Sequence, residues 1–408
     1  MPTVQTSHPP APQTIASHRR IIVAGLLALA TAMGIGRFAF TPLLPMMLHD
    51  GAISLGEASW LASANYIGYL VGALFCTFRP LSKPTVLIRV GLVSTIALTL
   101  GMAAPWGPLW PWLRFLAGIA SALVFVHTSG WCLTQVALRG HASLGAMIYT
   151  GPGAGIVLTG LAASAMVATG WRAASGWLAF GALALGLTVL VWSVLTGRNT
   201  LAPRGGTHTT QVQTESAHST AEVALLALAY GVAGFGYIIT ATFLPVIARQ
   251  VLVGSPWLDL FWPLLGCGVI AGALIASRMK QVRDLRWMLV FCYLMQAAGV
   301  AMGQFLPNLF GFALGSLLVG IPFTAITYFA MQEARRVRPQ QVASTIGLLT
   351  ALYGLGQILG PPLAAYLIAH AASASAGFAM ALDMAAGSLL LGVVFFAILI
   401  RRYPVPMP

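Results

Sequence analysis

Charged and titratable side chains are scarce in this chain, so each one inside an apolar run is a candidate for chemistry. The 408 residues include 21 Lys or Arg, 8 Asp or Glu and 8 His. Arg37, Arg114 and His127 all lie within long apolar runs. A charge at that depth is costly and usually faces a wet cavity or a partner inside a helix bundle. A guanidinium can bind a carboxylate through two parallel hydrogen bonds, and a histidine can exchange a proton near neutral pH.

Each of these three side chains also has a purely structural interpretation. Arg37 could pair with a carbonyl or an acid that only holds helices together. Arg114 lies near the end of its run and could extend to the lipid headgroups, and His127 could hydrogen-bond between helices. We expect all three to contact substrate or to take part in ion coupling, with these structural roles as the alternatives.

Neutral polar side chains in the apolar runs extend the candidate site. Residues three or four positions apart share one face of a helix, so they can line the same cavity. Such groups also hold membrane helices together by hydrogen bonds, which is the alternative. The candidates for pocket lining are Asn65 with Tyr69, Thr324 with Thr327 and Tyr328, and Tyr353 with Gln357.

Proton coupling through a carboxylate requires an acid within the membrane. Glu57 and Asp259 begin the second and eighth apolar runs, at matching places in the two halves of the chain. We expect one or both of them to carry protons. Asp383 lies about two helical turns into the last run.

No catalytic residue, cofactor or metal site is expected. The four cysteines form no C-x-x-C pair, and the sequence lacks H-E-x-x-H, G-x-S-x-G and the phosphate loop G-x-x-x-x-G-K-[ST]. These absences argue against a membrane-embedded enzyme and an ATP-driven pump. A non-transporting membrane sensor or receptor would usually carry a soluble output domain, for which the connectors are too short.

The candidate residues must be positioned by helices in a lipid bilayer. Hydrophobic residues make up 58% of the chain and charged residues only 7%, whereas soluble domains have about 25% charged residues. The net charge is +13, but the basic residues lie in short connectors and not on one exposed face, which argues against a nucleic-acid partner. Backbone groups in lipid must pair within their own segment, so the apolar runs are helices.

Twelve apolar runs are long enough to cross a bilayer, which takes about 20 residues. We therefore predict an all-α integral membrane protein with twelve transmembrane helices. They are predicted at 21–47, 55–78, 85–104, 109–133, 143–169, 175–196, 222–247, 257–277, 286–304, 308–331, 342–369 and 376–400.

The basic residues predict the orientation. With the N-terminus in the cytoplasm, 17 of the 21 Lys and Arg residues face the cytoplasm and only Arg172 and Arg249 face the outside. A polar stretch rich in Thr, Ser and Gly divides the helices into six and six. We predict a disordered cytoplasmic N-terminus at 1–20, a six-helix bundle at 21–196, a cytoplasmic linker at 197–221, a second bundle at 222–400 and a cytoplasmic tail at 401–408. The predicted location is the cytoplasmic (inner) membrane.

The two halves repeat weakly when the sequence is shifted by 200 positions. Matching pairs include Gly34 with Gly234, Gly36 with Gly236, Pro45 with Pro245, Gly68 with Gly268 and Gly72 with Gly272. The same shift places Tyr237 opposite Arg37, so the halves differ there, as an asymmetric substrate requires. We add Tyr237 to the candidate binding residues.

Several motifs carry a resemblance to a known family over essentially the whole chain. They are Arg114-Phe-Leu-Ala-Gly118, Gly151-Pro152-Gly-Ala-Gly155, Gly170-Trp171-Arg172, the segment from Met33 to Pro45, and the segment from Trp60 to Tyr69. The first resembles an R-x-x-x-G motif and the second the G-P-x-x-G core of an antiporter motif. The chain resembles the major facilitator superfamily (MFS), in its YbfB/YjiJ-type branch.

The resemblance implies the MFS fold, in which two pseudo-symmetric six-helix bundles rock about a central site. Gly118, Gly151, Pro152 and Gly155 would then serve helix packing or gating. One departure concerns the loop after the second helix, which lacks the acid of the family's usual Asp-Arg pair. The matching loop of the second half contains Asp284 as its only acid.

We therefore expect a secondary active transporter that moves a small organic molecule by alternating access. Proton coupling is expected, and the antiporter-like motif favours export. The intramembrane arginines favour an anion or a zwitterion as substrate. The expected partners are this substrate, protons and the lipid bilayer, and we expect the protein to act as a monomer.

Overall fold

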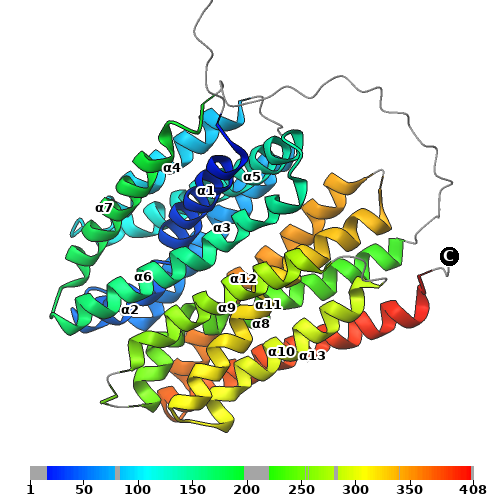
Figure 1. Cartoon of the computed structure of the whole chain (residues 1–408). Helices are drawn as coiled ribbons and strands as arrows, with labels where there is room; N and C mark the ends of the chain where they lie inside the picture. The colour runs from blue at the N-terminus through cyan, green and yellow to red at the C-terminus, as the bar shows by residue number, and fades with distance from the viewer. Residues whose placement is uncertain are drawn as a thin grey trace, which may run out of the picture.

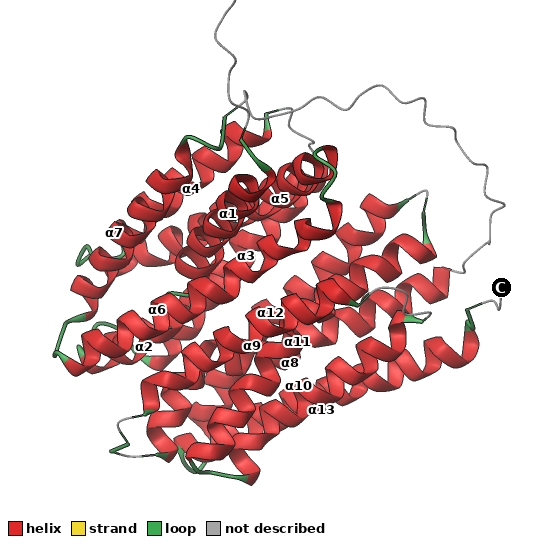
Figure 2. Ribbon diagram, viewed as in Figure 1, coloured by secondary structure: helices red, strands yellow, loops and turns green. Residues whose placement is uncertain are grey.

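The computed structural model describes residues 16–78, 83–196, 220–252, 254–255, 257–279, 284–339 and 341–405. Within these residues the chain forms helices and connecting turns, and no strand occurs (Figure 2). Most of the predicted disordered N-terminus and of the predicted linker lies outside the described residues. Residues 18–20, which we assigned to the disordered terminus, already belong to the first helix.

Twelve helical segments of the described chain are long and apolar enough to span a membrane, as predicted. Several of them consist of more than one element. In chain order the elements are α1 (His18–Leu29), η1 (Ala30–Arg37), α2 (Phe40–His49), α3 (Leu55–Phe78), α4 (Pro84–Gly101), η2 (Gly107–Leu109), α5 (Trp110–Leu138), η3 (Ala142–Tyr149), α6 (Thr150–Ala168), α7 (Ala173–Trp192), α8 (Thr220–Val251), η5 (Leu258–Leu260), α9 (Phe261–Arg278), α10 (Leu285–Phe305), α11 (Leu309–Val337), α12 (Val342–His370) and α13 (Ala374–Arg402).

The helices form two bundles that lie side by side, α1 to α7 in one and α8 to α13 in the other (Figure 1). Side chains on the outer surface are largely apolar. Leu190 is 68% exposed, Phe310 67% and Leu359 62%. Since burial of apolar surface drives folding in water but not in lipid, this outward-facing apolar surface is typical of a membrane protein.

Glycines allow the same close helix contact at matching places in the two bundles. A Cβ atom on Gly72 of α3 would lie 3.0 Å from the carbonyl oxygen of Ile119 in α5. A Cβ atom on Gly272 of α9 would lie 1.8 Å from the carbonyl oxygen of Ile321 in α11. Helices α3 and α5 therefore pair in the first bundle as α9 and α11 pair in the second. This structural repeat agrees with the sequence repeat at the shift of 200.

The first membrane span is irregular where it approaches the second bundle. Residues 30–37 form a π-helix, in which the Phe38 N–H donates to the Met33 carbonyl at 3.0 Å. Pro42 has no N–H to give to the Phe38 carbonyl, which instead accepts from Thr41 at 3.2 Å. Short π-helical segments often occur at functional sites. Here the segment ends on Arg37.

Contacts between the bundles form along two pairs of helices, α3 with α12 and α6 with α9, and between α2 and α8. The Thr41 hydroxyl donates to the Ala241 carbonyl at 2.8 Å, and the Ser63 hydroxyl donates to the Ile358 carbonyl at 2.9 Å. The Tyr66 hydroxyl and the Thr242 hydroxyl are 3.0 Å apart. Residues 41 and 241 are related by the shift of 200, so matching helices meet on the pseudo-symmetry axis.

Candidate functional site

Arg37 lies at the end of the π-helical segment and points into the junction between the bundles. Its side chain is 4% exposed. The guanidinium lies 4.0 Å from the ring centre of Tyr69 and 5.2 Å from that of Tyr66. A cation over an aromatic face is stabilised by the ring's negative charge distribution. The described residues place no carboxylate in an ion pair with Arg37, and its Nε atom has no hydrogen-bond partner there.

Gln357 of α12 connects Arg37 to the second bundle. Its Oε1 atom accepts from Arg37 Nη2 at 2.8 Å, and its Nε2 atom donates to the Tyr237 hydroxyl. Arg37 and Tyr237 are the residues that the shift of 200 pairs. One amide side chain therefore binds both members of this repeat pair.

Aromatic rings of the second bundle form the other wall of this cluster. The rings of Tyr353 and Tyr230 stack with centres 4.6 Å apart, and those of Tyr353 and Tyr237 with centres 5.8 Å apart. Phe323 of α11 meets the Tyr237 ring edge-on at 4.9 Å. Stacked rings beside a guanidinium can hold a flat apolar group next to a negatively charged one. We call Arg37, Tyr69, Tyr237, Tyr353 and Gln357 the central cluster.

Arg114 supports the central cluster from behind. It is 2% exposed, and its guanidinium donates to the carbonyls of Gly36 and Arg37 at 3.2 and 3.0 Å. Asn65 donates in turn to the Arg114 carbonyl at 2.9 Å. Arg114 does not extend toward the end of its helix. Its guanidinium binds the carbonyls at the end of the π-helical segment, and Asn65 binds the backbone of the helix that carries Arg114.

Three further predicted residues lie apart from these contacts. His127 of α5 is half-buried, with its Nε2 atom 3.8 Å from the Cys76 sulfur. The Thr324 hydroxyl donates weakly to the Val269 carbonyl at 3.4 Å, and Tyr328 accepts from Gln332 at 3.3 Å. The last two side chains are on α11, which also carries Phe323.

The acids expected to carry protons have local partners in the structure. Glu57 is exposed and accepts from the backbone and hydroxyl of Ser54 at 2.7 and 2.8 Å, which caps the start of α3. Asp259 pairs with Arg249. Asp383 is exposed on α13. Within the described residues no group of His, Cys, Asp and Glu is arranged to hold a metal.

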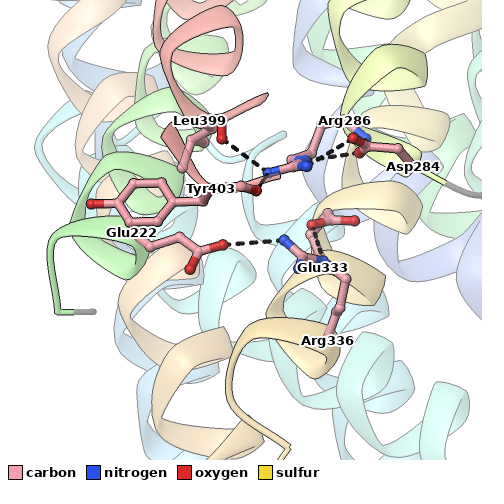
Figure 3. A network of polar contacts seen from close by, with 7 residues as sticks. All are labelled: Glu222, Asp284, Arg286, Glu333, Arg336, Leu399 and Tyr403. Carbon is pink, nitrogen blue, oxygen red and sulfur yellow. Dashed lines mark hydrogen bonds and ion pairs between the residues drawn. The ribbon is translucent and has the colours of Figure 1, made fainter. Parts of the chain in front are cut away.

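A second polar cluster ties together the helix ends of the second bundle (Figure 3). Arg336 of α11 binds Glu333 at 2.8 Å and Glu222 of α8 at 3.2 Å. Arg286 of α10 is 1% exposed and binds Asp284 through two nitrogens, each at 2.8 Å. Its remaining nitrogen donates to the carbonyls of Leu399 and Tyr403 at 3.0 and 2.6 Å, which anchors the end of α13.

Asp284 precedes the first turn of α10, outside the membrane-spanning segment. Burial acts to raise the pKa of its carboxyl group, but the hydrogen bonds and the charge of Arg286 outweigh burial and lower the pKa. The carboxylate is therefore ionised at neutral pH and neutralises the buried guanidinium. All residues of this cluster belong to the second bundle, so it fastens helices of one bundle and does not bridge the two.

The glycine-rich segment at the start of α6 lies between the first span and the second bundle. Cβ atoms on Gly151 and Gly155 would lie 2.3 Å from the Leu26 carbonyl oxygen and 2.6 Å from that of Ala30. Gly153 faces the other way, toward the Gly266 carbonyl of α9. Gly118 similarly allows α5 to approach α3. Pro152 is buried between the two glycine contacts.

Sequence reasoning missed Tyr66, Tyr230, Phe323, Phe38 and Trp262. Phe38 meets the rings of Trp262 and Phe323 at 6.2 and 6.0 Å. Tyr230 and Tyr237 are seven residues apart and therefore share a face of α8. This spacing is a signal that could have found Tyr230. The other aromatic residues resemble lipid-facing ones in sequence.

The chain matches the model of a family described as "Uncharacterised MFS-type transporter YbfB" over residues 29–397. The chain belongs to this family of MFS transporters. As an MFS member it is a membrane transporter and not an enzyme, and the predicted family and fold are confirmed.

Two curated relatives and one solved structure support this assignment. This MFS chain is 27% identical over 366 residues to a chloramphenicol resistance protein of Streptomyces lividans, covering 85% of this chain and 88% of that protein. It is 25% identical over 351 residues to the uncharacterized MFS-type transporter YceJ of Bacillus subtilis strain 168, with coverages of 82% and 86%. A mutant of the nucleoside transporter NupG shares the fold, with a TM-score of 0.65, 12% identity and coverages of 94% and 99%.

Proposed function

We propose that this MFS transporter exports a small organic anion or zwitterion that carries an aromatic or similarly flat apolar group. The central cluster would bind it, with the negative group at Arg37 and the flat group against Tyr353 and Tyr237. The observation that carries the proposal is a buried guanidinium with no carboxylate partner among the described residues. Such a charge is costly to bury unless a ligand or a polar network compensates it.

Binding would compete with the contact between the bundles. A substrate that binds Arg37 replaces the bond to Gln357 and so removes a link between α1–α2 and α12. The loss of this link would favour rocking of the bundles about the site, which is the alternating-access mechanism. Gly151, Gly153 and Gly155 provide close contacts on both sides of α6 along which this movement would occur.

Export, proton coupling and location are parts of the same proposal. The name of the Streptomyces lividans relative describes chloramphenicol resistance, which favours export. We propose that influx of protons drives export, with His127, Glu57 and Asp259 as the candidate carriers. The distribution of basic residues supports a cytoplasmic-membrane protein with both termini in the cytoplasm. We propose that it acts as a monomer.

Thermal unfolding of the purified protein with aromatic carboxylates, aromatic zwitterions, chloramphenicol and hydrophobic cations tests the substrate class. A ligand at about 100 times its Kd should stabilise the protein by about 2.7 kcal/mol. We expect carboxylates or zwitterions to do so, and Arg37→Ala to abolish the effect. Arg402→Ala, which removes an exposed arginine from the end of α13, is the matched control.

Flux in sealed proteoliposomes then separates transport from mere binding. A ligand found in this way should be moved by wild type and by Arg402→Ala, and not by Arg37→Ala. An imposed proton gradient should drive the flux, and an uncoupler should abolish it. Stabilisation by hydrophobic cations alone would overturn the anion assignment. Binding without flux would favour a sensor.

A further inference from the structure

The first bundle has a groove at the helix ends nearest to the linker, far from the central cluster along the span. It lies between the first turns of α1 and the last turn of α7, with a volume of about 360 Å³. Arg19, Arg20 and Ser193 are its polar lining residues. Val23 and Leu190 line the rest and are 53% and 68% exposed. The groove therefore joins a strongly basic end to an apolar wall that faces the surrounding lipid.

The positive charge of this groove is not neutralised within the described chain. The first turn of α1 contains no acidic residue, although an acid is favoured at that end of a helix and a cation is not. Every arginine–carboxylate pair formed between two described residues lies in the second bundle. A third guanidinium, that of Arg89, lies on the Trp192 ring at 4.5 Å and donates to the Trp192 carbonyl.

In the second bundle, an acidic residue of the chain itself neutralises a basic residue at the corresponding helix ends. Helix α8 opens the second bundle as α1 opens the first, and its first turn contains Glu222. Glu222 is bound by Arg336 (Figure 3). The corresponding place in the first bundle has two arginines and an open groove. An anion from outside the chain would supply the charge that Glu222 supplies in the second bundle.

We propose that this groove binds an anionic phospholipid, with its phosphate at Arg19 and Arg20 and an acyl chain along Val23 and Leu190. The apolar wall favours a lipid over free phosphate, because only a lipid would cover both ends of the groove. Basic pockets between transmembrane helices are suited to acidic headgroups. The site is separate from the central cluster, so it acts on stability or on the movement of the first bundle and does not bind the transported molecule.

Lipid binding to the delipidated full-length protein tests the proposal. Native mass spectrometry and thermal unfolding would compare phosphatidylglycerol with phosphatidylcholine of the same acyl chains. We expect phosphatidylglycerol to bind about tenfold more tightly or better. Replacing both arginines, in the double variant Arg19→Gln with Arg20→Gln, should weaken its binding about 30-fold. The double variant Arg19→Lys with Arg20→Lys should retain most of the binding, because it keeps the charge.

The chain offers a matched control in Arg401 and Arg402. They are also an exposed arginine pair at a helix end, and an even number of spans places them at the same membrane face. Neither of them lines the groove. Replacing both with Gln should change phosphatidylglycerol binding less than threefold. Leu190→Trp, which narrows the groove without removing charge, should weaken binding.

Three outcomes would overturn the proposal. The first is equal stabilisation by the two lipids. The second is an equal loss of binding in the two arginine-pair variants, which would indicate diffuse attraction to the whole basic face. The third is full stabilisation by inorganic phosphate at matched ionic strength, which would indicate an anion site without a lipid. Because the measurement needs no substrate, its failure leaves the proposed transport activity untouched.

Discussion

Arg37 and Gln357 lie 320 positions apart in the chain, and a hydrogen bond of 2.8 Å joins their side chains. The bond connects the first span of one bundle to α12 of the other. Gln357 also binds Tyr237, the residue at the position equivalent to Arg37. One link between the bundles thus passes through the residues proposed to bind substrate. In the proposed mechanism, ligand binding at Arg37 would compete with this contact between the bundles.

Two substitutions of Gln357 should change the strength of this contact between the bundles while keeping Arg37, the residue proposed to bind the substrate. Gln357→Glu places a carboxylate against a buried guanidinium, which should stabilise the contact between the bundles and slow transport at least tenfold. Gln357→Ala removes the link and leaves Arg37 available for ligand. We expect it to lower the melting temperature while retaining ligand binding. Melting temperature, ligand affinity and flux in proteoliposomes measure the three effects.

A double-mutant cycle between Arg37→Ala and Gln357→Ala checks that the two side chains act together. Residues in one hydrogen-bond network usually show an interaction energy of about 0.5–3 kcal/mol. Strictly additive effects on stability would contradict the coupling. The pair Arg37→Ala with Arg338→Ala is the control, because Arg338 lies just after the end of α11 and its side chain donates to Gln341 of the same bundle.

Gly153 should control how closely the bundles pack. A Cβ atom there would lie 2.8 Å from the Gly266 carbonyl oxygen and 2.9 Å from the Ile270 nitrogen, both backbone atoms of α9. Gly153→Ala should therefore push α6 away from α9 and destabilise this arrangement by about 1–3 kcal/mol. Gly186→Ala, where a Cβ atom meets nothing within 4 Å, should have little effect.

Accessibility of the buried inter-bundle contact measures this change. Ala241→Cys, in a chain whose four native cysteines are replaced, reports on the place where Thr41 binds the second bundle. The reactivity of this thiol toward a membrane-impermeant reagent should rise in Gly153→Ala and not in Gly186→Ala. Equal reactivity in the two variants would show that the glycine contact does not hold the bundles together.

Much of the fold follows from hydropathy alone. Only helices satisfy the backbone in lipid, so the twelve spans were predictable, and the predicted helix 55–78 coincides with α3 (Leu55–Phe78). The end of α11 was predicted six residues too early, at 331 instead of Val337. Its last turns contain Glu333 and Arg336, whose mutual pairing lets a charged segment remain helical. Hydropathy does not detect such compensation.

The members of the central cluster were among the predicted candidates, and their contacts were not predictable. Arg37, Tyr69, Tyr353 and Gln357 were candidates because each is a polar group at depth, and Tyr237 was a candidate because the shift of 200 pairs it with Arg37. The bond between Arg37 and Gln357 depends on how two bundles meet, which no local pattern encodes. The π-helical segment that ends at Arg37 could not be predicted from the sequence either, because its glycines are equally compatible with ordinary helix packing. Arg114 was expected at the site, whereas the structure shows it holding the backbone of Arg37.

Arg286 should be among the most important residues for the stability of the second bundle. Its side chain is almost fully buried and binds Asp284 and two carbonyls of the α13 end. Arg286→Met would leave the Asp284 carboxylate without its partner, and breaking a buried pair in this way costs about 3–5 kcal/mol. We expect a large fall in melting temperature. Arg338→Met, at a partly exposed position just after α11, should change it little.

The joint variant Arg286→Met with Asp284→Leu tests the physical reason. If the cost arises from an uncompensated charge, removing both charges should restore part of the lost stability. If the double variant is as unstable as Arg286→Met alone, the carbonyls of Leu399 and Tyr403 account for the loss. Either result shows whether the ion pair or the bonds to the two carbonyls account for the lost stability of the cluster shown in Figure 3.

Asp284 should also give the second bundle a defined response to acid. Its pKa is lowered in the folded protein, so the unfolded chain binds the proton more readily. The resulting stability is fully present above the unfolded pKa of about 3.9 and is lost as the pH falls through the lower folded value. Wild type should therefore lose stability more steeply below about pH 4 than Asp284→Asn, whose amide does not titrate. Melting temperatures measured between about pH 3 and pH 6 give the comparison, and parallel curves for the two proteins would contradict an ionised Asp284 bound to Arg286.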